Sequence, residues 1–155
     1  MKVFADTNFY TNLWLELAHA DRAHTLYARL LKSGGSLPVT RLVRMELTNA
    51  LQRLVYESRH GSQDIRVSPE AALAAHEDFD AELIAGDVLV WQALPEDELE
   101  ATFETLAYRH TATGGFRTYD LLHVASALVL GCDSFWSFDA RACRLAKLAG
   151  LKTPV

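Results

Sequence analysis

Short apolar runs alternate along this chain with longer stretches in which apolar residues recur every three or four positions. The short runs, at residues 3–5, 37–39, 88–91 and 134–138, predict strands. The longer stretches predict helices, because a period of 3.6 residues places their apolar side chains on one face. Short apolar strands that alternate with helices imply an α/β fold with a parallel sheet covered on both faces.

The predicted helices span approximately residues 8–18, 21–32, 41–59, 69–85, 95–112, 120–130 and 141–149. Asp21 and Thr40 are candidate caps for the second and third of them, since both side chains accept backbone hydrogen bonds. Residues 61–68 are polar and predict a loop, and residues 151–155 predict a final edge strand. No repeat or linker interrupts the chain, so we expect one domain over residues 1–155.

Composition narrows the class of protein. Half of the 155 residues are hydrophobic, which favours one compact domain over disorder. No apolar run is long enough for a membrane span, and we expect no secretory signal. Cys132 and Cys143 suit small buried residues in a reducing compartment, so we expect a cytoplasmic protein without a zinc site. The net charge of −5 argues mildly against nucleic acid as a partner, unless bound cations reverse the local field.

Four acidic residues occupy special positions. Asp6 and Asp139 each follow a predicted strand and precede a helix, and the carboxyl ends of parallel strands share one edge of a sheet. The other two lie on helices. Asp120 falls in the first turn of a helix that is apolar all round, and Glu46 lies roughly 60–70° from the centre of an apolar stripe.

A cluster of carboxylates suits a divalent cation. Crowded carboxylates repel one another and raise each other's pKa, and a hard cation such as Mg²⁺ removes that cost. Asn8 and Ser137 could add neutral oxygen atoms, and Ser137 would project from the same face as Asp139 if the strand continues that far. Arg117 and Arg141 flank the acidic residues and are candidates for binding RNA phosphates, with Arg44 a weaker one.

Ordinary structural roles account for the same residues one at a time. Asp6 and Asp139 could be helix caps, and Asp120 could complement a helix dipole. Glu46 could be a surface residue at the edge of its stripe. His123, one turn after Asp120, fits a packed and hydrogen-bonded histidine better than a general acid, and we expect the other five histidines to be solvated.

Four segments together resemble the PIN-domain family, in particular the VapC-type ribonuclease toxins of bacterial toxin–antitoxin pairs. The matching segments are Ala5-Asp6-Thr7-Asn8, residues 44–51 around Glu46, residues 119–125 around Asp120, and residues 137–141 around Asp139. A single such motif is common by chance. Four of them in the order of the family span practically the whole chain.

The resemblance implies a three-layer α/β/α sandwich and an endoribonuclease that depends on Mg²⁺ or Mn²⁺. It also implies that Asp6, Glu46, Asp120 and Asp139 form the catalytic metal site, in which a metal-activated water attacks the phosphorus without a covalent intermediate. A small antitoxin protein and a homodimer are the partners that it implies.

Two other classes compete with a nuclease. A phosphatase of the haloacid-dehalogenase type would need a second aspartate two residues after Asp6, where this chain has Asn8. A non-catalytic α/β regulatory or protein-interaction module could hold Mg²⁺ at the same acidic site. A receiver-like module, however, needs a lysine at a late strand end, and Lys147 and Lys152 do not lie there.

Overall fold

The structure is a computed structural model that describes residues 2–61 and 66–154. Within these residues the strands are β1 (Val3–Ala5), β2 (Leu37–Val39), β3 (Leu89–Trp91) and β4 (Ser134–Trp136). Its long helices are α1 (Thr7–Trp14), α2 (Ala20–Lys32), α3 (Arg41–His60), α4 (Pro69–Ala85), α5 (Glu96–Leu106), α7 (Thr118–Val129) and α8 (Ala140–Leu148). A π-helical turn, Ala107–Thr111, and α6 (Ala112–Gly114) follow α5. The predicted α/β class is confirmed.

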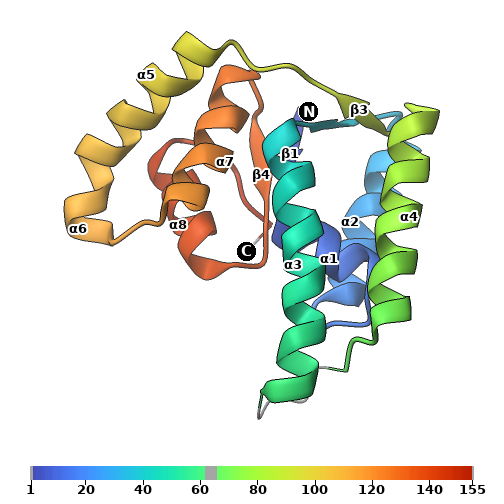
Figure 1. Cartoon of the computed structure of the whole chain (residues 1–155). Helices are drawn as coiled ribbons and strands as arrows, with labels where there is room; N and C mark the ends of the chain where they lie inside the picture. Colours follow the sequence, from blue (N-terminus) through green and yellow to red (C-terminus); the bar gives the residue numbers. More distant parts are fainter. Residues whose placement is uncertain (1, 62–65, 155) are drawn as a thin grey trace.

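The strands run parallel in two pairs. β1 pairs with β4, with Val3 opposite Ser134, and β2 pairs with β3, with Leu37 opposite Leu89. β1 also contacts β2, so the two pairs lie next to each other. Figure 1 shows α1 to α4 grouped around β1 to β3, and α5 to α8 on the side of β4. This is the expected α/β/α arrangement, and it brings the carboxyl ends of β1 and β4 side by side.

Burial of aromatic side chains holds the centre of the fold together. Phe4 of β1 stacks on Phe135 of β4, with ring centroids 6.0 Å apart. Tyr10 of α1 packs edge-on against Phe79 of α4 at 5.3 Å, and Trp14 also contacts Phe79. Trp14 is partly buried and packs against the core. These contacts fix α1, which starts immediately after Asp6, against the rest of the domain.

Several predicted boundaries are correct. Thr40 caps α3, because its hydroxyl accepts a hydrogen bond from the Val43 amide at 3.3 Å. Pro69 opens α4, and Gly86 ends it in the left-handed conformation that glycine tolerates. Gly150 follows α8 with a φ of 87°. The predicted loop at residues 61–68 lies partly outside the described residues.

The first helix is shorter than predicted and the second has a different cap. α1 ends at Trp14 rather than near residue 18, because the Asn12 side chain accepts a hydrogen bond from the His19 amide and stabilises a turn. α2 begins at Ala20, which places Asp21 inside the first turn instead of at the cap. Asp21 therefore complements the helix dipole, and its predicted capping role is wrong.

The C-terminal predictions also need correction. β4 ends at Trp136, not at residue 138, so strand alternation does not place Ser137 and Asp139 on one face. The predicted edge strand is reduced to a single bridge between Lys152 and Ser134, and Val155 lies outside the described residues. The helical segment after β3 passes its predicted end and continues to Gly114, where Gly115 turns the chain with a φ of 64°.

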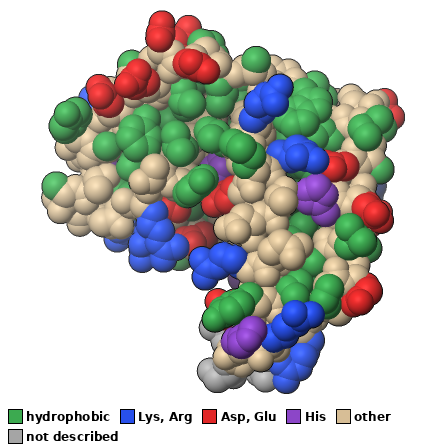
Figure 2. All heavy atoms as spheres, in the orientation of Figure 1, with side chains coloured by type: hydrophobic (Ala, Val, Ile, Leu, Met, Phe, Trp, Pro, Cys, Tyr) green, Lys and Arg blue, Asp and Glu red, His purple; other side chains and the backbone are tan. Residues whose placement is uncertain are grey.

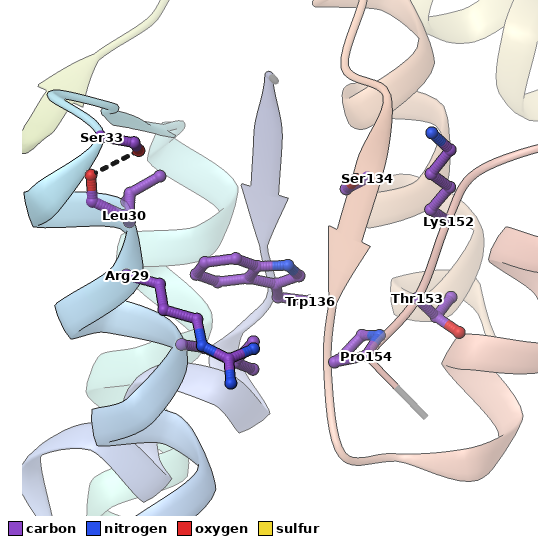
Figure 3. A pocket seen from close by; sticks show the side chains of 9 residues that line it. Arg29, Leu30, Ser33, Ser134, Trp136, Lys152, Thr153 and Pro154 are labelled. Atoms are coloured by element: carbon purple, nitrogen blue, oxygen red, sulfur yellow. Dashed lines mark hydrogen bonds between the residues drawn. The ribbon is translucent and has the colours of Figure 1, made fainter.

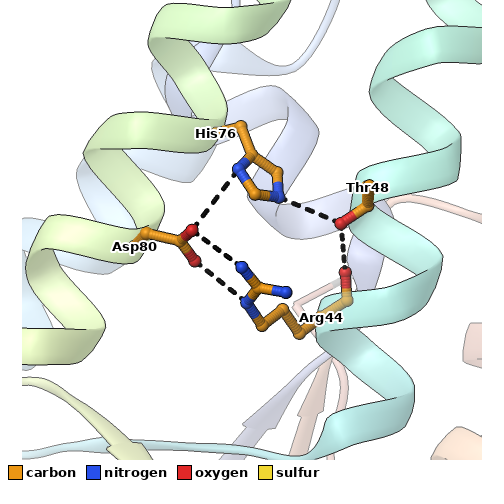
Figure 4. Close-up of polar contacts among 4 residues, drawn as sticks. All are labelled: Arg44, Thr48, His76 and Asp80. Carbon is orange, nitrogen blue, oxygen red and sulfur yellow. Dashed lines mark hydrogen bonds and ion pairs between the residues drawn. The ribbon is translucent and has the colours of Figure 1, made fainter.

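A polar network joins α3 to α4 on the surface (Figure 4). Arg44 donates two hydrogen bonds to the Asp80 carboxylate, at 2.8 and 3.0 Å, and His76 bridges Asp80 and Thr48. Arg44 is thus bound by a protein carboxylate, which argues against it as a phosphate ligand. His76 is therefore held by protein partners and is not simply solvated, in contrast to the expectation from the sequence. His24 is exposed as expected, and its Nε2 also lies 2.8 Å from the Leu13 carbonyl.

Candidate functional site

Asp6 is a buried carboxylate at the carboxyl end of β1. Only 6% of the residue is exposed. It caps α1, because its Oδ1 accepts a hydrogen bond from the Phe9 amide at 3.0 Å. Burial raises its pKa to about 6, although His123, Ser137 and the Phe9 amide act in the opposite direction. Asp6 therefore caps α1 from a buried position with a raised pKa, unlike a helix cap at the surface.

Glu46 lies on α3, and its charge acts on Asp6. Its Oε2 accepts a hydrogen bond from the Thr7 hydroxyl at 2.6 Å and contacts the Nε2 of His123. Burial by itself would raise the pKa of Glu46, but His123 and Thr7 outweigh it and the pKa is lowered. Glu46 is therefore a positioned anion at a core boundary, and not a free surface residue.

His123 is the buried residue that orients Glu46. It is 3% exposed, and its ring lies 6.1 Å from that of Phe4. Its Nδ1 is buried with no hydrogen-bond partner among the described residues. The packed and hydrogen-bonded histidine expected from the sequence is confirmed, and its hydrogen bond goes to one of the four acidic residues.

Asp120 and Asp139 form a second acidic pair, at the starts of α7 and α8. Asp120 accepts a hydrogen bond from the Arg117 amide at 3.1 Å. Burial raises the pKa of Asp120, and the nearby Asp139 raises it further, while Arg117 and Arg141 lower it. Asp139 caps α8 by accepting hydrogen bonds from the amides of Arg141 and Ala142, at 2.7 and 3.2 Å.

Asn8 and Ser137 tie the two strand ends together. The Asn8 side-chain oxygen accepts a hydrogen bond from the Phe138 amide at 2.9 Å. The Ser137 hydroxyl oxygen accepts one from the Asp139 amide, also at 2.9 Å, and the same side chain hydrogen-bonds Asp6. Ser137 therefore touches both strand-end aspartates. Its position comes from the turn after β4 and not from the strand geometry assumed from the sequence.

Two pairs of these carboxylates interact through their charges. The charge of Glu46 raises the pKa of Asp6, and the charge of Asp139 raises that of Asp120. Figure 2 shows acidic side chains in a recess of this face, with Lys and Arg side chains at its rim. The two arginines whose charges reach Asp120, Arg117 and Arg141, are both exposed.

The donor set fits a hard divalent cation. In the described part of the chain, no three His, Cys, Asp or Glu side chains converge as a ready metal cage. Mg²⁺ does not need one, because it usually takes one or two carboxylates and keeps several waters. A buried carboxylate such as Asp6, held with an elevated pKa, gains most from a cation beside it. Asp6, Glu46, Asp120 and Asp139 are the oxygen donors available.

Thr7 also belongs to this site, although its hydrogen bond to Glu46 was not predicted from the sequence. Its hydroxyl holds Glu46 from the first turn of α1, and the residue is 5% exposed. Its position between Asp6 and Asn8 was the available signal. The pairing with Glu46 joins residues 39 positions apart, and no local pattern encodes such a contact.

Comparisons with known proteins point to one family. A family model described as "PIN domain" matches residues 3–148. No curated protein sequence matches the chain significantly.

Solved structures share the fold over nearly the whole chain. VapC20 of Mycobacterium tuberculosis, described as a sarcin-ricin loop cleaving toxin, is 22% identical with a TM-score of 0.64, over 96% of this chain and 95% of that one. VapBC2 of Rickettsia felis, bound to a DNA fragment from its promoter, is 14% identical with a TM-score of 0.66, over 99% and 97%. FitAcB of Neisseria gonorrhoeae is 13% identical with a TM-score of 0.60, over 97% and 95%.

Proposed function

This chain belongs to the PIN-domain family, and from that premise we propose that it is a metal-dependent endoribonuclease that acts as the toxin of a toxin–antitoxin pair. One observation carries the proposal. The buried Asp6 carboxylate, with its pKa raised to about 6, lies at a strand end together with Glu46, which Thr7 and His123 hold in place. Burying a carboxylate at this cost is typical of functional sites.

Each acidic residue has a defined part in the proposed site. Asp6, Glu46, Asp120 and Asp139 would hold one or two Mg²⁺ or Mn²⁺ ions. A bound divalent cation supplies an activated water and neutralises charge on the scissile phosphodiester. Thr7 and His123 orient Glu46, and Ser137 orients Asp6 and Asp139. Arg117 and Arg141 bind RNA phosphates at the rim, where both are exposed.

The decisive experiment incubates purified protein with total RNA, with and without Mg²⁺ or Mn²⁺. We expect discrete cleavage products only when the metal is present, and loss of cleavage in Asp6→Asn. Asp97→Asn is the matched control, since Asp97 is exposed in the first turn of α5. Undiminished cleavage by a folded, metal-free Asp6→Asn protein overturns the proposal.

The same experiment separates the competing classes. A non-catalytic module with an acidic metal site would bind Mn²⁺ in a calorimetric titration and leave every RNA intact. The haloacid-dehalogenase alternative is disfavoured by the Asn8 side chain, whose oxygen is occupied by the Phe138 amide. An amide engaged in this way cannot replace the aspartic acid of that mechanism.

Two protein partners follow from the proposed role. We expect a small antitoxin, encoded next to this chain, that covers the acidic recess and suppresses cleavage. We also expect a cytoplasmic homodimer. No described helix has the length and apolar character needed to cross a membrane. Co-purification with the product of the neighbouring reading frame, and light scattering on the free protein, test these two expectations.

A further inference from the structure

A second cavity lies away from the acidic recess, between α2, β4 and the segment after α8. Its volume is about 370 Å³, within the range of small-molecule sites. Figure 3 shows its walls: Arg29 and Leu30 come from α2, Trp136 lies against them, and Lys152 and Pro154 close the opposite side. None of its nine lining residues is acidic.

Two buried side chains present unused hydrogen-bond donors to this cavity. Trp136 is 5% exposed and Ser134 is 3% exposed, yet neither the indole N–H nor the Ser134 hydroxyl has a partner within residues 2–61 and 66–154. Neither atom is among the fully buried side-chain atoms that lack a partner in the described residues, so both donors are open to solvent in the cavity. Two accessible donors on one cavity suit a ligand with acceptor atoms.

The strand geometry explains why these two donors converge. Ser134 and Trp136 are two positions apart on β4, so their side chains project from the same face. Phe135 projects from the other face, where it stacks on Phe4. The cavity is thus built by the alternation of β4 and is separate from the carboxylates at its carboxyl end.

The positive charges at the cavity indicate which class of ligand it suits. Arg29 and Lys152 are exposed cations at the cavity, and neither side chain forms an ion pair with any acidic residue that the structure describes. The protein as a whole carries a net charge of −5, so this positive lining is a local exception. Leu26, Leu30 and Pro154 add apolar walls. The ligand therefore combines an anionic group with an apolar or ring portion.

We propose that this cavity binds a phosphate monoester of the size of a nucleoside monophosphate. Arg29 and Lys152 contact the phosphate, the Ser134 hydroxyl and the Trp136 indole N–H donate to acceptor oxygens or ring nitrogens, and the leucines cover the apolar part. The ligand is a free mononucleotide or the 5′-phosphorylated end of an RNA chain, which share this chemistry. The site does not depend on the proposed nuclease activity.

The test follows the indole N–H resonance of Trp136 in ¹⁵N-labelled protein, assigned with Trp136→Phe. AMP, adenosine, inorganic phosphate and a 5′-phosphorylated trinucleotide are titrated separately. We expect AMP to shift the Trp136 resonance and to bind more tightly than adenosine or phosphate alone. Tighter binding of the trinucleotide than of AMP assigns the site to RNA ends, and the reverse order assigns it to free nucleotides.

Variants make the test specific. Arg29→Ala should weaken AMP binding about tenfold or more, as expected for loss of a charged hydrogen bond. Arg53→Ala removes an exposed arginine from α3 and serves as the matched control. Retained chemical-shift dispersion shows that each variant is folded. The proposal fails if millimolar AMP leaves the Trp136 resonance unmoved, or if Arg29→Ala binds AMP as well as Arg53→Ala does.

Discussion

His123 and Glu46 lie 77 residues apart in the sequence, yet the imidazole Nε2 contacts the Glu46 Oε2 in the folded protein. Thr7 donates its hydroxyl hydrogen bond to the same oxygen. One carboxylate oxygen is therefore shared by a histidine from α7 and a threonine from α1. This arrangement leaves Glu46 with one fixed orientation beside Asp6.

We predict that His123→Gln weakens the proposed metal site without removing a ligand. Residues that orient metal ligands typically contribute about 10–100-fold to metal affinity or activity. Mn²⁺ affinity, measured by calorimetry, and RNA cleavage should both fall within this range, while the circular dichroism spectrum stays unchanged. Tyr56, which packs its ring against His60 on the surface, offers a control in Tyr56→Phe. Unaltered Mn²⁺ affinity in His123→Gln contradicts the orienting role.

The stability of the metal-free protein should depend on Asp6 and pH. The pKa of Asp6 rises from 3.8 to about 6 on folding, so the folded state holds the proton more tightly. Stability from this residue is full below about pH 4 and is lost as pH rises through about 6. Asp6→Asn keeps an oxygen for the Phe9 amide and carries no charge.

In EDTA at pH 8, Asp6→Asn should therefore be more stable than the wild type, by at most ~3 kcal/mol. The difference should shrink as the pH is lowered toward 5. Urea unfolding at a series of pH values measures it. A less stable Asp6→Asn protein at pH 8 means that the buried carboxylate is already compensated within the fold.

Divalent cations should make the wild type more stable than Asp6→Asn. A ligand that binds only the folded state stabilises it by about 2.7 kcal/mol at 100 times its Kd. Mg²⁺ or Mn²⁺ should raise the melting temperature of the wild type and have little effect on Asp6→Asn or Asp120→Asn. Differential scanning calorimetry with and without EDTA provides the measurement. Equal shifts in wild type and both variants would place the cation elsewhere.

Both cysteines should be unreactive in the folded protein. Burial raises the pKa of the Cys132 and Cys143 thiols to about 11, which leaves little thiolate at pH 8. A thiol-specific reagent such as Ellman's reagent should modify neither residue until the protein is unfolded in guanidinium chloride, when both should react. Rapid modification of one thiol in the native state would show that the segment around it opens locally.

The bond between Arg44 and Asp80 should serve stability and not catalysis. Partly exposed ion pairs contribute up to about 1 kcal/mol, and this one has bidentate geometry. Arg44→Ala and Asp80→Ala should each lower the free energy of unfolding by about that much, and the double variant by less than the sum. RNA cleavage should remain near wild type in Arg44→Ala, in contrast to Arg117→Ala. A large loss of RNA cleavage in Arg44→Ala would contradict the assignment of Arg44 to stability alone.

The sequence by itself determined the alternation of strands and helices and the strand-end positions of Asp6 and Asp139. Both follow from local rules: apolar periodicity, helix caps and the common edge of parallel strands. The same rules misplaced the ends of the first helix and of the last strand. There, the Asn12 side chain and the turn at Ser137 replaced regular backbone hydrogen bonds.

Only the tertiary structure decided which side chains meet. Packing of α3 against α1, and of α7 against β4, brings Glu46, His123 and Thr7 together, and the hydrogen bonds from His123 and Thr7 lower the pKa of Glu46 despite its burial. It also showed that Arg44 is held by Asp80 and that Trp136 faces a cavity. Such contacts join residues that are distant in the chain, and periodicity carries no information about them because it describes one element at a time.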